Sequence, residues 1–204
     1  MSKTIFLNQN WIFSKEGYDE PVTLPHTWNA IDGQDGGNDY YRGTCSYTTV
    51  LPNIVLPESG RAVLQFDAVA MTAEVYLNEQ KLAEHKGGYS AFCVDITDAL
   101  RNGSNLLRVN VDNSDNDTVY PQKADFTFYG GLYRGVNLIS VPGTHFDLDY
   151  FGGPGIKVTP KPTEDGGATF EIESWVTNGE EAYTVMYSIC LLYTSPSPRD
   201  MRRS

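Results

Sequence analysis

The segment Ala73-Glu74-Val75-Tyr76-Leu77-Asn78-Glu79-Gln80 alternates apolar and polar residues until it reaches an asparagine. Such alternation places one face of an extended strand on a hydrophobic core and the other face in water. The same alternation returns in Arg108-Val109-Asn110-Val111. Asn78-Glu79-Gln80 predicts a hairpin turn, because asparagine tolerates the positive backbone φ that tight hairpin turns require.

Short runs rich in Val, Ile, Tyr, Phe and Thr recur between turn residues, a spacing typical of an all-β sandwich. The expected strands cover residues 62–66, 73–77, 92–96, 106–111, 136–141, 156–159, 169–176 and 183–189. The one helical expectation is a single turn capped by Thr97 and stopped by Gly103. The sequence therefore predicts the all-β fold class.

Composition excludes several classes of protein. The chain has 204 residues and a formal net charge of −11, which disfavours binding to nucleic acid through its phosphate backbone. It contains no apolar run of membrane-spanning length and no export signal at its start. Its three cysteines cannot form a closed disulfide framework, and no spacing suited to zinc occurs. We therefore expect a cytoplasmic protein with neither membrane nor nucleic-acid partners.

Turn-forming residues divide the chain into two units. Val141-Pro142-Gly143-Thr144 closes the first set of strands, so we expect a first domain over residues 1–143. A second set, with a hairpin turn at Gly166-Gly167, extends over residues 144–189. These 46 residues are about half of the roughly 100 that a seven-stranded immunoglobulin-like sandwich needs, so the second domain is expected to be incomplete.

The last residues, 190–204, differ in character from the rest. They contain three Arg and one acidic residue, whereas the preceding part has 12 basic and 25 acidic residues. One interpretation is a disordered tail that contains prolines. The other is that the run from Cys190 to Asp200 is the translation of a sequencing adapter, so that the natural sequence departs near Ile189. We expect the second and exclude this tail from the fold.

Two stretches carry the residues best suited to binding chemistry. The segment 24–43 combines aspartates, asparagines, an arginine, two tyrosines and Trp28 in a glycine-rich context. Carboxylates and amides can pair with sugar hydroxyls, while aromatic faces cover a pyranose ring. The alternative is that the loop residues satisfy their own turns and Trp28 belongs to the core. The second stretch, 120–136, sets Asp125 among aromatic residues beside Gly130-Gly131, and composition alone does not decide its role.

Several motifs occur in the order found in one family of enzymes. They are Leu7-Asn8-Gln9-Asn10-Trp11, Leu24-Pro25-His26-Thr27-Trp28-Asn29, Asp32-Gly33-Gln34-Asp35-Gly36-Gly37-Asn38-Asp39-Tyr40-Tyr41-Arg42-Gly43, Ala73-Glu74-Val75-Tyr76-Leu77-Asn78, His85-Lys86-Gly87-Gly88-Tyr89, Val111-Asp112-Asn113 and Gly130-Gly131-Leu132-Tyr133-Arg134. Together they resemble the amino-terminal portion of a glycoside hydrolase of family 2, over residues 4 to about 189. The glycine-rich loop is most similar to that of the bacterial β-galactosidases in the family.

The resemblance implies a jelly-roll, galactose-binding-like sandwich over 1–143, followed by an incomplete immunoglobulin-like sandwich. In the family, a (β/α)8 barrel supplies the two glutamates of a retaining mechanism. No residue of this chain matches either glutamate, so the resemblance implies no catalytic residue here and an inactive fragment.

The resemblance also implies site residues for this chain. Asn38 or Asp39 matches a loop asparagine near the sugar, and Asp125 matches an acidic residue that contacts the sugar or a bound cation. No cofactor is expected in the fragment, and a Na or Mg ion at Asp125 is an expectation for the complete enzyme. Two departures from the family pattern are Glu79, where glycine is usual, and the position of Ser46, near which the family usually has an aromatic residue, so that the local register is left open.

The function that follows is that of an amino-terminal piece of a β-galactosidase, whose partner is a β-galactoside and which can form homo-oligomers when complete. Within the same family, β-glucuronidase and β-mannosidase remain as alternatives. A free-standing carbohydrate-binding module and a sandwich without ligand are the alternatives from other classes of protein.

Overall fold

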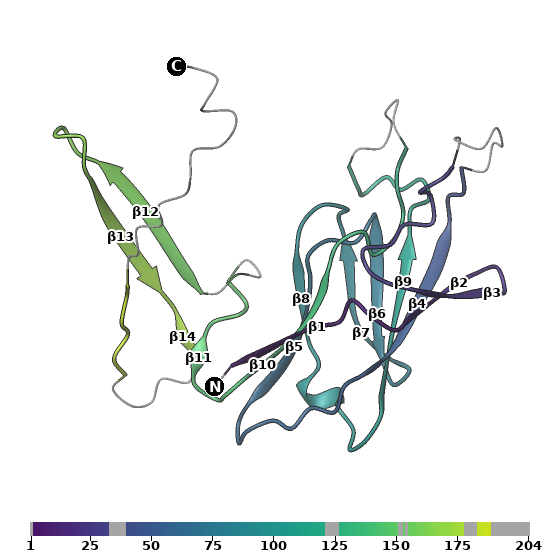
Figure 1. Ribbon diagram of the computed structural model, residues 1–204, viewed down its shortest axis with the longest axis horizontal. Coiled ribbons are helices and arrows are strands. Elements are labelled where there is room, and N and C mark those ends of the chain that lie inside the picture. The colour runs from purple at the N-terminus through teal and green to yellow at the C-terminus, as the bar shows by residue number, and fades with distance from the viewer. Residues whose placement is uncertain are drawn as a thin grey trace.

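The computed structural model describes residues 2–32, 40–120, 127–150, 153, 155–177 and 183–188. Ten strands form a sandwich of two antiparallel sheets (Figure 1). They are β1 (Lys3–Phe6), β2 (Trp11–Lys15), β3 (Tyr18–Val22), β4 (Thr44–Leu51), β5 (Arg61–Phe66), β6 (Thr72–Leu77), β7 (Gln80–Lys86), β8 (Phe92–Asp95), β9 (Asn105–Asp112) and β10 (Val136–Val141). One sheet has the order β3-β2-β4-β9-β6-β7 and the other β1-β10-β5-β8. The predicted all-β class is confirmed.

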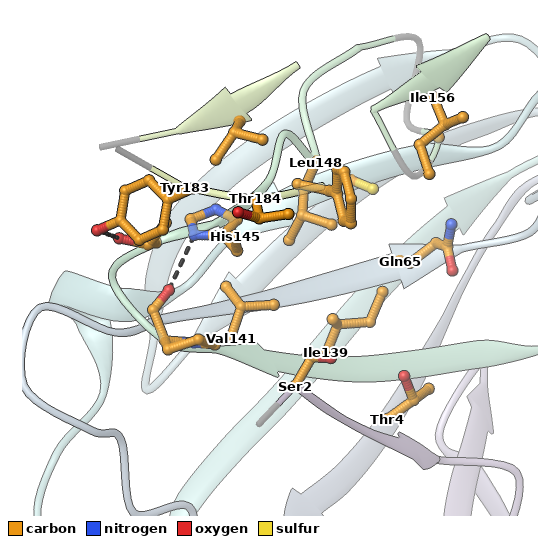
Figure 2. Close-up of a pocket in the computed structure, with 16 residues that line it drawn as sticks. Ser2, Thr4, Gln65, Ile139, Val141, His145, Leu148, Ile156, Tyr183 and Thr184 are labelled. Carbon is orange, nitrogen blue, oxygen red and sulfur yellow. Dashed lines mark hydrogen bonds between the residues drawn. The ribbon is translucent and has the colours of Figure 1, made fainter. Parts of the chain in front are cut away.

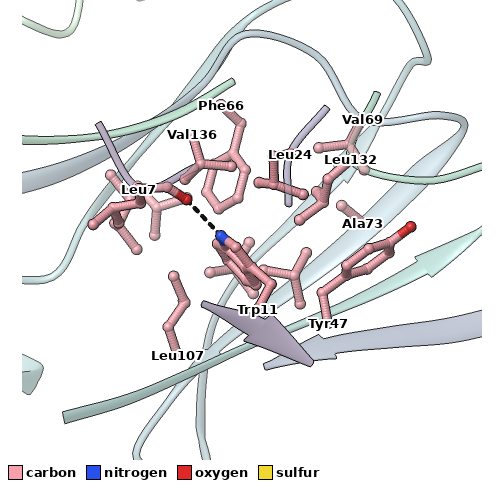
Figure 3. Packing of buried hydrophobic residues seen from close by; sticks show 14 of the residues in the cluster. Leu7, Trp11, Leu24, Tyr47, Phe66, Val69, Ala73, Leu107, Leu132 and Val136 are labelled. Atoms are coloured by element: carbon pink, nitrogen blue, oxygen red, sulfur yellow. Dashed lines mark hydrogen bonds between the residues drawn. The ribbon is translucent and has the colours of Figure 1, made fainter. Parts of the chain in front are cut away.

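The hydrophobic core lies between these two sheets (Figure 3). Trp11 and Tyr47 from the larger sheet are fully buried together with Phe66 from the smaller one. Full burial of a large apolar side chain contributes about 1.5–3 kcal/mol to stability. The indole Nε1 of Trp11 donates to the Leu7 carbonyl at 2.5 Å, so its one polar group is satisfied inside the core.

The predicted strands agree with β5, β6, β8, β9, β10, β12 (Ile156–Pro162) and β13 (Ala168–Ser174). The strand expected over 183–189 is absent from its described part, residues 183–188, where Met186 is 89% exposed. Strands β1 to β4 and β7 were not anticipated from the pattern. In β3, Pro21 interrupts the alternation, and the strand tolerates it because it lies at the edge of its sheet.

The single helical turn, η1 (Thr97–Ala99), is confirmed, but its predicted capping by Thr97 is wrong. The residue that precedes the turn is Ile96, and no side chain caps it. The Thr97 hydroxyl instead donates to Asp95 Oδ1 at 2.5 Å and accepts from the Ala62 N–H at 3.0 Å. This three-residue turn is the only helix in the described part of the chain, so no membrane-spanning helix is found there.

Both predicted hairpin turns are confirmed. Asn78 and Glu79 form a two-residue connection between β6 and β7 and have φ of 50° and 70°. Gly166, in the connection between β12 and β13, has φ of 83°. Glu79 thus occupies a left-handed position that favours glycine.

Beyond the sandwich, the described residues form two small two-stranded sheets, β11 (His145–Phe146) with β14 (Val176–Thr177), and β12 with β13. The β12–β13 hairpin stands to one side of the sandwich in Figure 1. One of its faces carries the ion pair of Lys157 and Glu173, at 2.8 Å. On its apolar face, Val158 is 52% and Phe170 is 48% exposed. No described residue gives this hairpin the second sheet that a sandwich requires.

We predict that replacing Glu79 by glycine stabilises the protein by about 1 kcal/mol, because it removes the left-handed strain of a residue with a Cβ. The Glu79 carboxylate also lies 3.2 Å from Arg108, but such an exposed pair contributes only about 0–1 kcal/mol. Urea unfolding of Glu79→Gly measures the change. Glu79→Ala is the matched control, since it removes the same carboxylate and keeps the Cβ. A gain of equal size in the control would contradict the explanation.

We also predict that residues 1–143 alone form a soluble monomer, whereas the 204-residue chain associates or is cleaved after Pro142. The apolar core lies within the first unit, and an isolated two-stranded hairpin is at best marginally stable. Its exposed apolar face and open strand edges favour association. Limited proteolysis and size-exclusion chromatography of both chains test this. A monodisperse, protease-resistant 204-residue chain beside an insoluble 1–143 fragment would contradict the domain boundary.

Candidate functional site

The three predicted site residues lie outside the described residues, Asn38 and Asp39 in segment 33–39 and Asp125 in segment 121–126. Their roles therefore stay predictions. The structure does describe the residues that flank these two segments, and they lie together at one end of the sandwich. We call Asn29, Tyr40, Arg42, Asn113, Phe128 and Gly130 the loop roots.

Asn29 is fully buried and lies at the centre of the loop roots. Its Oδ1 accepts hydrogen bonds from the Gly130 N–H at 2.8 Å and from Asn113 Nδ2 at 3.1 Å. Its Nδ2 donates to the Tyr41 carbonyl at 2.9 Å and to Asp32 Oδ2 at 2.5 Å. One side chain thus joins residues on both sides of segment 33–39 to the stretch that follows segment 121–126.

Asn113, at the end of β9, is also fully buried and completes the connection. Its Nδ2 donates to the Phe128 carbonyl at 2.8 Å, and its Oδ1 accepts from the Gly43 N–H at 2.9 Å. Because the two asparagines also bond to each other, three stretches distant in sequence are held at fixed separations. Residues on both sides of segment 33–39, and residues on the carboxyl side of segment 121–126, are therefore held in one hydrogen-bonded network.

Tyr40 and Arg42 form the outer layer of the loop roots. The Tyr40 hydroxyl accepts a hydrogen bond from the Phe128 N–H, and burial raises the pKa of this phenol. Arg42 donates from Nε to the Asn113 carbonyl at 2.8 Å, and its Nη1 lies 2.5 Å from Asp115. Its guanidinium carbon lies 4.9 Å from the centre of the Phe128 ring. Arg42 therefore serves as a cross-link, and its charge is paired with the exposed carboxylate of Asp115.

Gly130 and Gly131 allow the backbone to approach Trp28 and His26 closely. A Cβ at Gly130 would lie 2.0 Å from Cζ2 of Trp28, and one at Gly131 would lie 2.5 Å from the His26 carbonyl oxygen. Trp28 also stacks on Phe13, with ring centres 5.9 Å apart. Trp28 is therefore packed against the core, as the alternative interpretation of its role proposed.

His26 links the loop roots to the core. The Nδ1 atom of its ring lies 2.8 Å from the Tyr47 hydroxyl, and its backbone N–H donates to the Leu132 carbonyl at 2.9 Å. Burial lowers the pKa of His26, although the charge of Glu20 acts in the opposite direction. The imidazole is consequently neutral at neutral pH and serves as a packed hydrogen-bonding group.

The described residues contain no group of three His, Cys, Asp or Glu side chains that could hold a metal ion. The expected cation at Asp125 lies outside them and is untested. Of the cysteines in the described ranges, Cys45 and Cys93 are free thiols. Burial raises the pKa of Cys45 to about 12, so it is not a nucleophile at neutral pH.

The described residues also line two hollows that contain none of the loop roots. A cavity of about 580 Å³ separates the outer face of the smaller sheet, at Ile139 and Val141, from the segment that contains His145 and Leu148 (Figure 2). Its described lining carries no Asp, Glu, Lys or Arg. A polar groove of about 380 Å³ lies beside Glu74 and Glu84 on the larger sheet, where Lys81 bonds to both carboxylates.

Residues 1–142 match the sugar-binding domain of the glycosyl hydrolases of family 2, and the chain belongs to this family. It is 40% identical over 160 residues to a β-glucuronidase of Bacteroides fragilis, a match that covers 74% of this chain and 23% of that protein. A β-galactosidase of Thermoanaerobacter pseudethanolicus is 31% identical over 136 residues, covering 65% of this chain and 18% of that protein.

Among solved structures, an FMN-binding β-glucuronidase from Facaelibacterium prausnitzii L2-6 is 54% identical, with a TM-score of 0.82. The match covers 87% of this chain and 28% of that one. The chain thus spans about a quarter of the length of these β-glucuronidases. The family resemblance is confirmed, whereas the particular expectation of a β-galactosidase is not, since relatives of both activities match.

The sequence missed the structural roles of Asn29 and Asn113, although both lie in motifs that carry the family resemblance. They are separated by 84 positions, and only the folded chain places their amides together. The available signal was that Asn113 lies just beyond the strand expected over residues 106–111 and that Asn29 lies in the segment 24–43. That signal indicates a turn as readily as it indicates a buried hydrogen bond.

We predict that Asn113→Ala destabilises the protein by about 2–4 kcal/mol, because it leaves the Phe128 carbonyl and the Gly43 N–H without their buried partner. Urea unfolding measures the loss. Asn53→Ala, at an exposed position, is the control and should change stability by less than about 0.5 kcal/mol. Equal stability of the two variants would show that the loop roots do not depend on this amide.

Proposed function

We propose that residues 1–143 form the sugar-binding domain of a retaining β-glycosidase that acts on β-glucuronosides. The observation that carries the proposal is the pair of buried amides, which joins the residues that flank segment 33–39 to the stretch that follows segment 121–126. The choice of sugar is supported by the higher identity to β-glucuronidases, 40% and 54%, than to the β-galactosidase, 31%.

In this proposal the domain supplies contacts at the edge of a site whose chemistry lies elsewhere. Asn38 or Asp39 and Asp125 would hydrogen-bond to the sugar hydroxyls from the two segments. A retaining mechanism needs an acid/base and a nucleophilic carboxylate about 5–5.5 Å apart. The family supplies both from its barrel, so the 204-residue chain alone is expected to hydrolyse neither an aryl β-glucuronide nor an aryl β-galactoside. A sodium or magnesium ion at Asp125 is part of this proposal for the complete enzyme.

A second candidate, β-galactoside hydrolysis, is supported by the match to the T. pseudethanolicus enzyme. Domain exchange distinguishes the two. Residues 1–142 would replace the matching segment in the B. fragilis β-glucuronidase and, separately, in the T. pseudethanolicus β-galactosidase. We predict that the glucuronidase hybrid keeps kcat/KM on an aryl β-glucuronide within about tenfold of its parent, a loss of at most about 1.4 kcal/mol. The galactosidase hybrid should lose more on its own substrate.

Thermal melting of both hybrids provides the control for folding. A folded galactosidase hybrid with full activity beside a folded but inactive glucuronidase hybrid would overturn the choice of β-glucuronoside. Asp125→Ala in the active hybrid tests the contact with the sugar, since it should lower kcat/KM while the melting temperature stays unchanged.

A further inference from the structure

The connection between η1 and β9 carries an asparagine followed by a glycine. Residues 101–104 are all exposed, and Asn102 precedes Gly103. Gly103 has φ of 93°, and no heavy atom lies within 4 Å of the position that a Cβ would take there. The backbone around this pair is thus open to solvent.

An asparagine side chain can react with the backbone of the next residue. The backbone nitrogen, after losing its proton to water, attacks Cγ of the asparagine; a C–N bond forms and ammonia leaves, which gives a five-membered succinimide. Water then opens this ring to aspartate or to isoaspartate. Glycine in the following position favours the attack, because it has no Cβ to shield its nitrogen. The only co-reactant is water.

At Asn102 the structure leaves both reacting groups unengaged. Neither the Gly103 N–H nor the Asn102 side chain makes a hydrogen bond to any described residue. Asn116 provides the contrast, since its Oδ1 accepts from the N–H of Thr118 at 2.8 Å and from its hydroxyl at 2.6 Å. Asn116 is also followed by Asp117, which has a Cβ. We propose that Asn102 is a site of spontaneous deamidation in the folded protein.

The modification would disturb the supports of a neighbouring turn. Asn105, which is buried, donates to the carbonyls of Arg101 at 2.9 Å and Gly103 at 3.1 Å, and accepts from Asn78 Nδ2 at 2.8 Å. Isoaspartate at position 102 inserts one extra methylene into the backbone between the two carbonyls that Asn105 holds. Either product also makes the net charge one unit more negative than −11.

Ageing of the 204-residue chain in mildly alkaline buffer tests the proposal. Trypsin cuts after Arg101 and Arg108 and so isolates residues 102–108 for mass spectrometry, which separates this site from Asn178-Gly179, outside the described residues. A synthetic peptide of residues 102–108 sets the unprotected rate. We expect the folded chain to convert within about tenfold of that rate, since opening an exposed loop costs almost no free energy.

Conversion more than about a hundredfold slower than in the peptide would overturn the proposal, because it would mean that the fold protects the pair by about 2.7 kcal/mol. Equal conversion at Asn116 would also overturn it. Asn102→Ser should abolish the modification and leave the melting temperature unchanged. Asn102→Asp is the control for charge, because it has the added negative charge but not the longer backbone. The aged chain that contains isoaspartate should therefore have a lower melting temperature than Asn102→Asp. Identical melting would overturn the inferred effect on Asn105.

Discussion

Two buried amide side chains hold together the end of the sandwich that carries the candidate site. Asn29 and Asn113 are both fully removed from solvent, and burying an amide without partners costs about 1–3 kcal/mol. Their oxygens and nitrogens instead bond to each other and to the backbone of Tyr41, Gly43, Phe128 and Gly130. Losing any one of these bonds would leave a buried polar group without a partner. The three stretches therefore stabilise one another.

This arrangement requires close packing underneath it. Gly130 and Gly131 admit Trp28 and the His26 carbonyl at distances that a Cβ would forbid. The bond between His26 and the Tyr47 hydroxyl continues the contact into the core, where Tyr47 is fully buried. The loop roots are therefore an extension of the packed core.

The sequence predicts those parts of the fold whose cause is local. The alternation in β6 and β9 arises because one face of each strand is buried and the other is nearer to solvent. Asn78 predicts the turn because its preference for a positive φ does not depend on distant residues. The cap at Thr97 failed because Asp95 and the backbone of Ala62 both bond to its hydroxyl. The pair of Asn29 and Asn113 could not be predicted, since its hydrogen bonds exist only after β9 has packed into the sheet.

The same network limits how this domain could distinguish an acidic sugar from a neutral one. Arg42 is the cation of the loop roots, yet its charge is met by Asp115 and its guanidinium lies over the Phe128 ring. Releasing it to bind a carboxylate would break its bond to the Asn113 carbonyl and weaken the base on which both segments stand. Under the proposed function, selection of a glucuronoside over a galactoside would therefore rest on groups outside the loop roots. The contribution of the loop roots is structural, since their hydrogen bonds join three stretches that are distant in sequence.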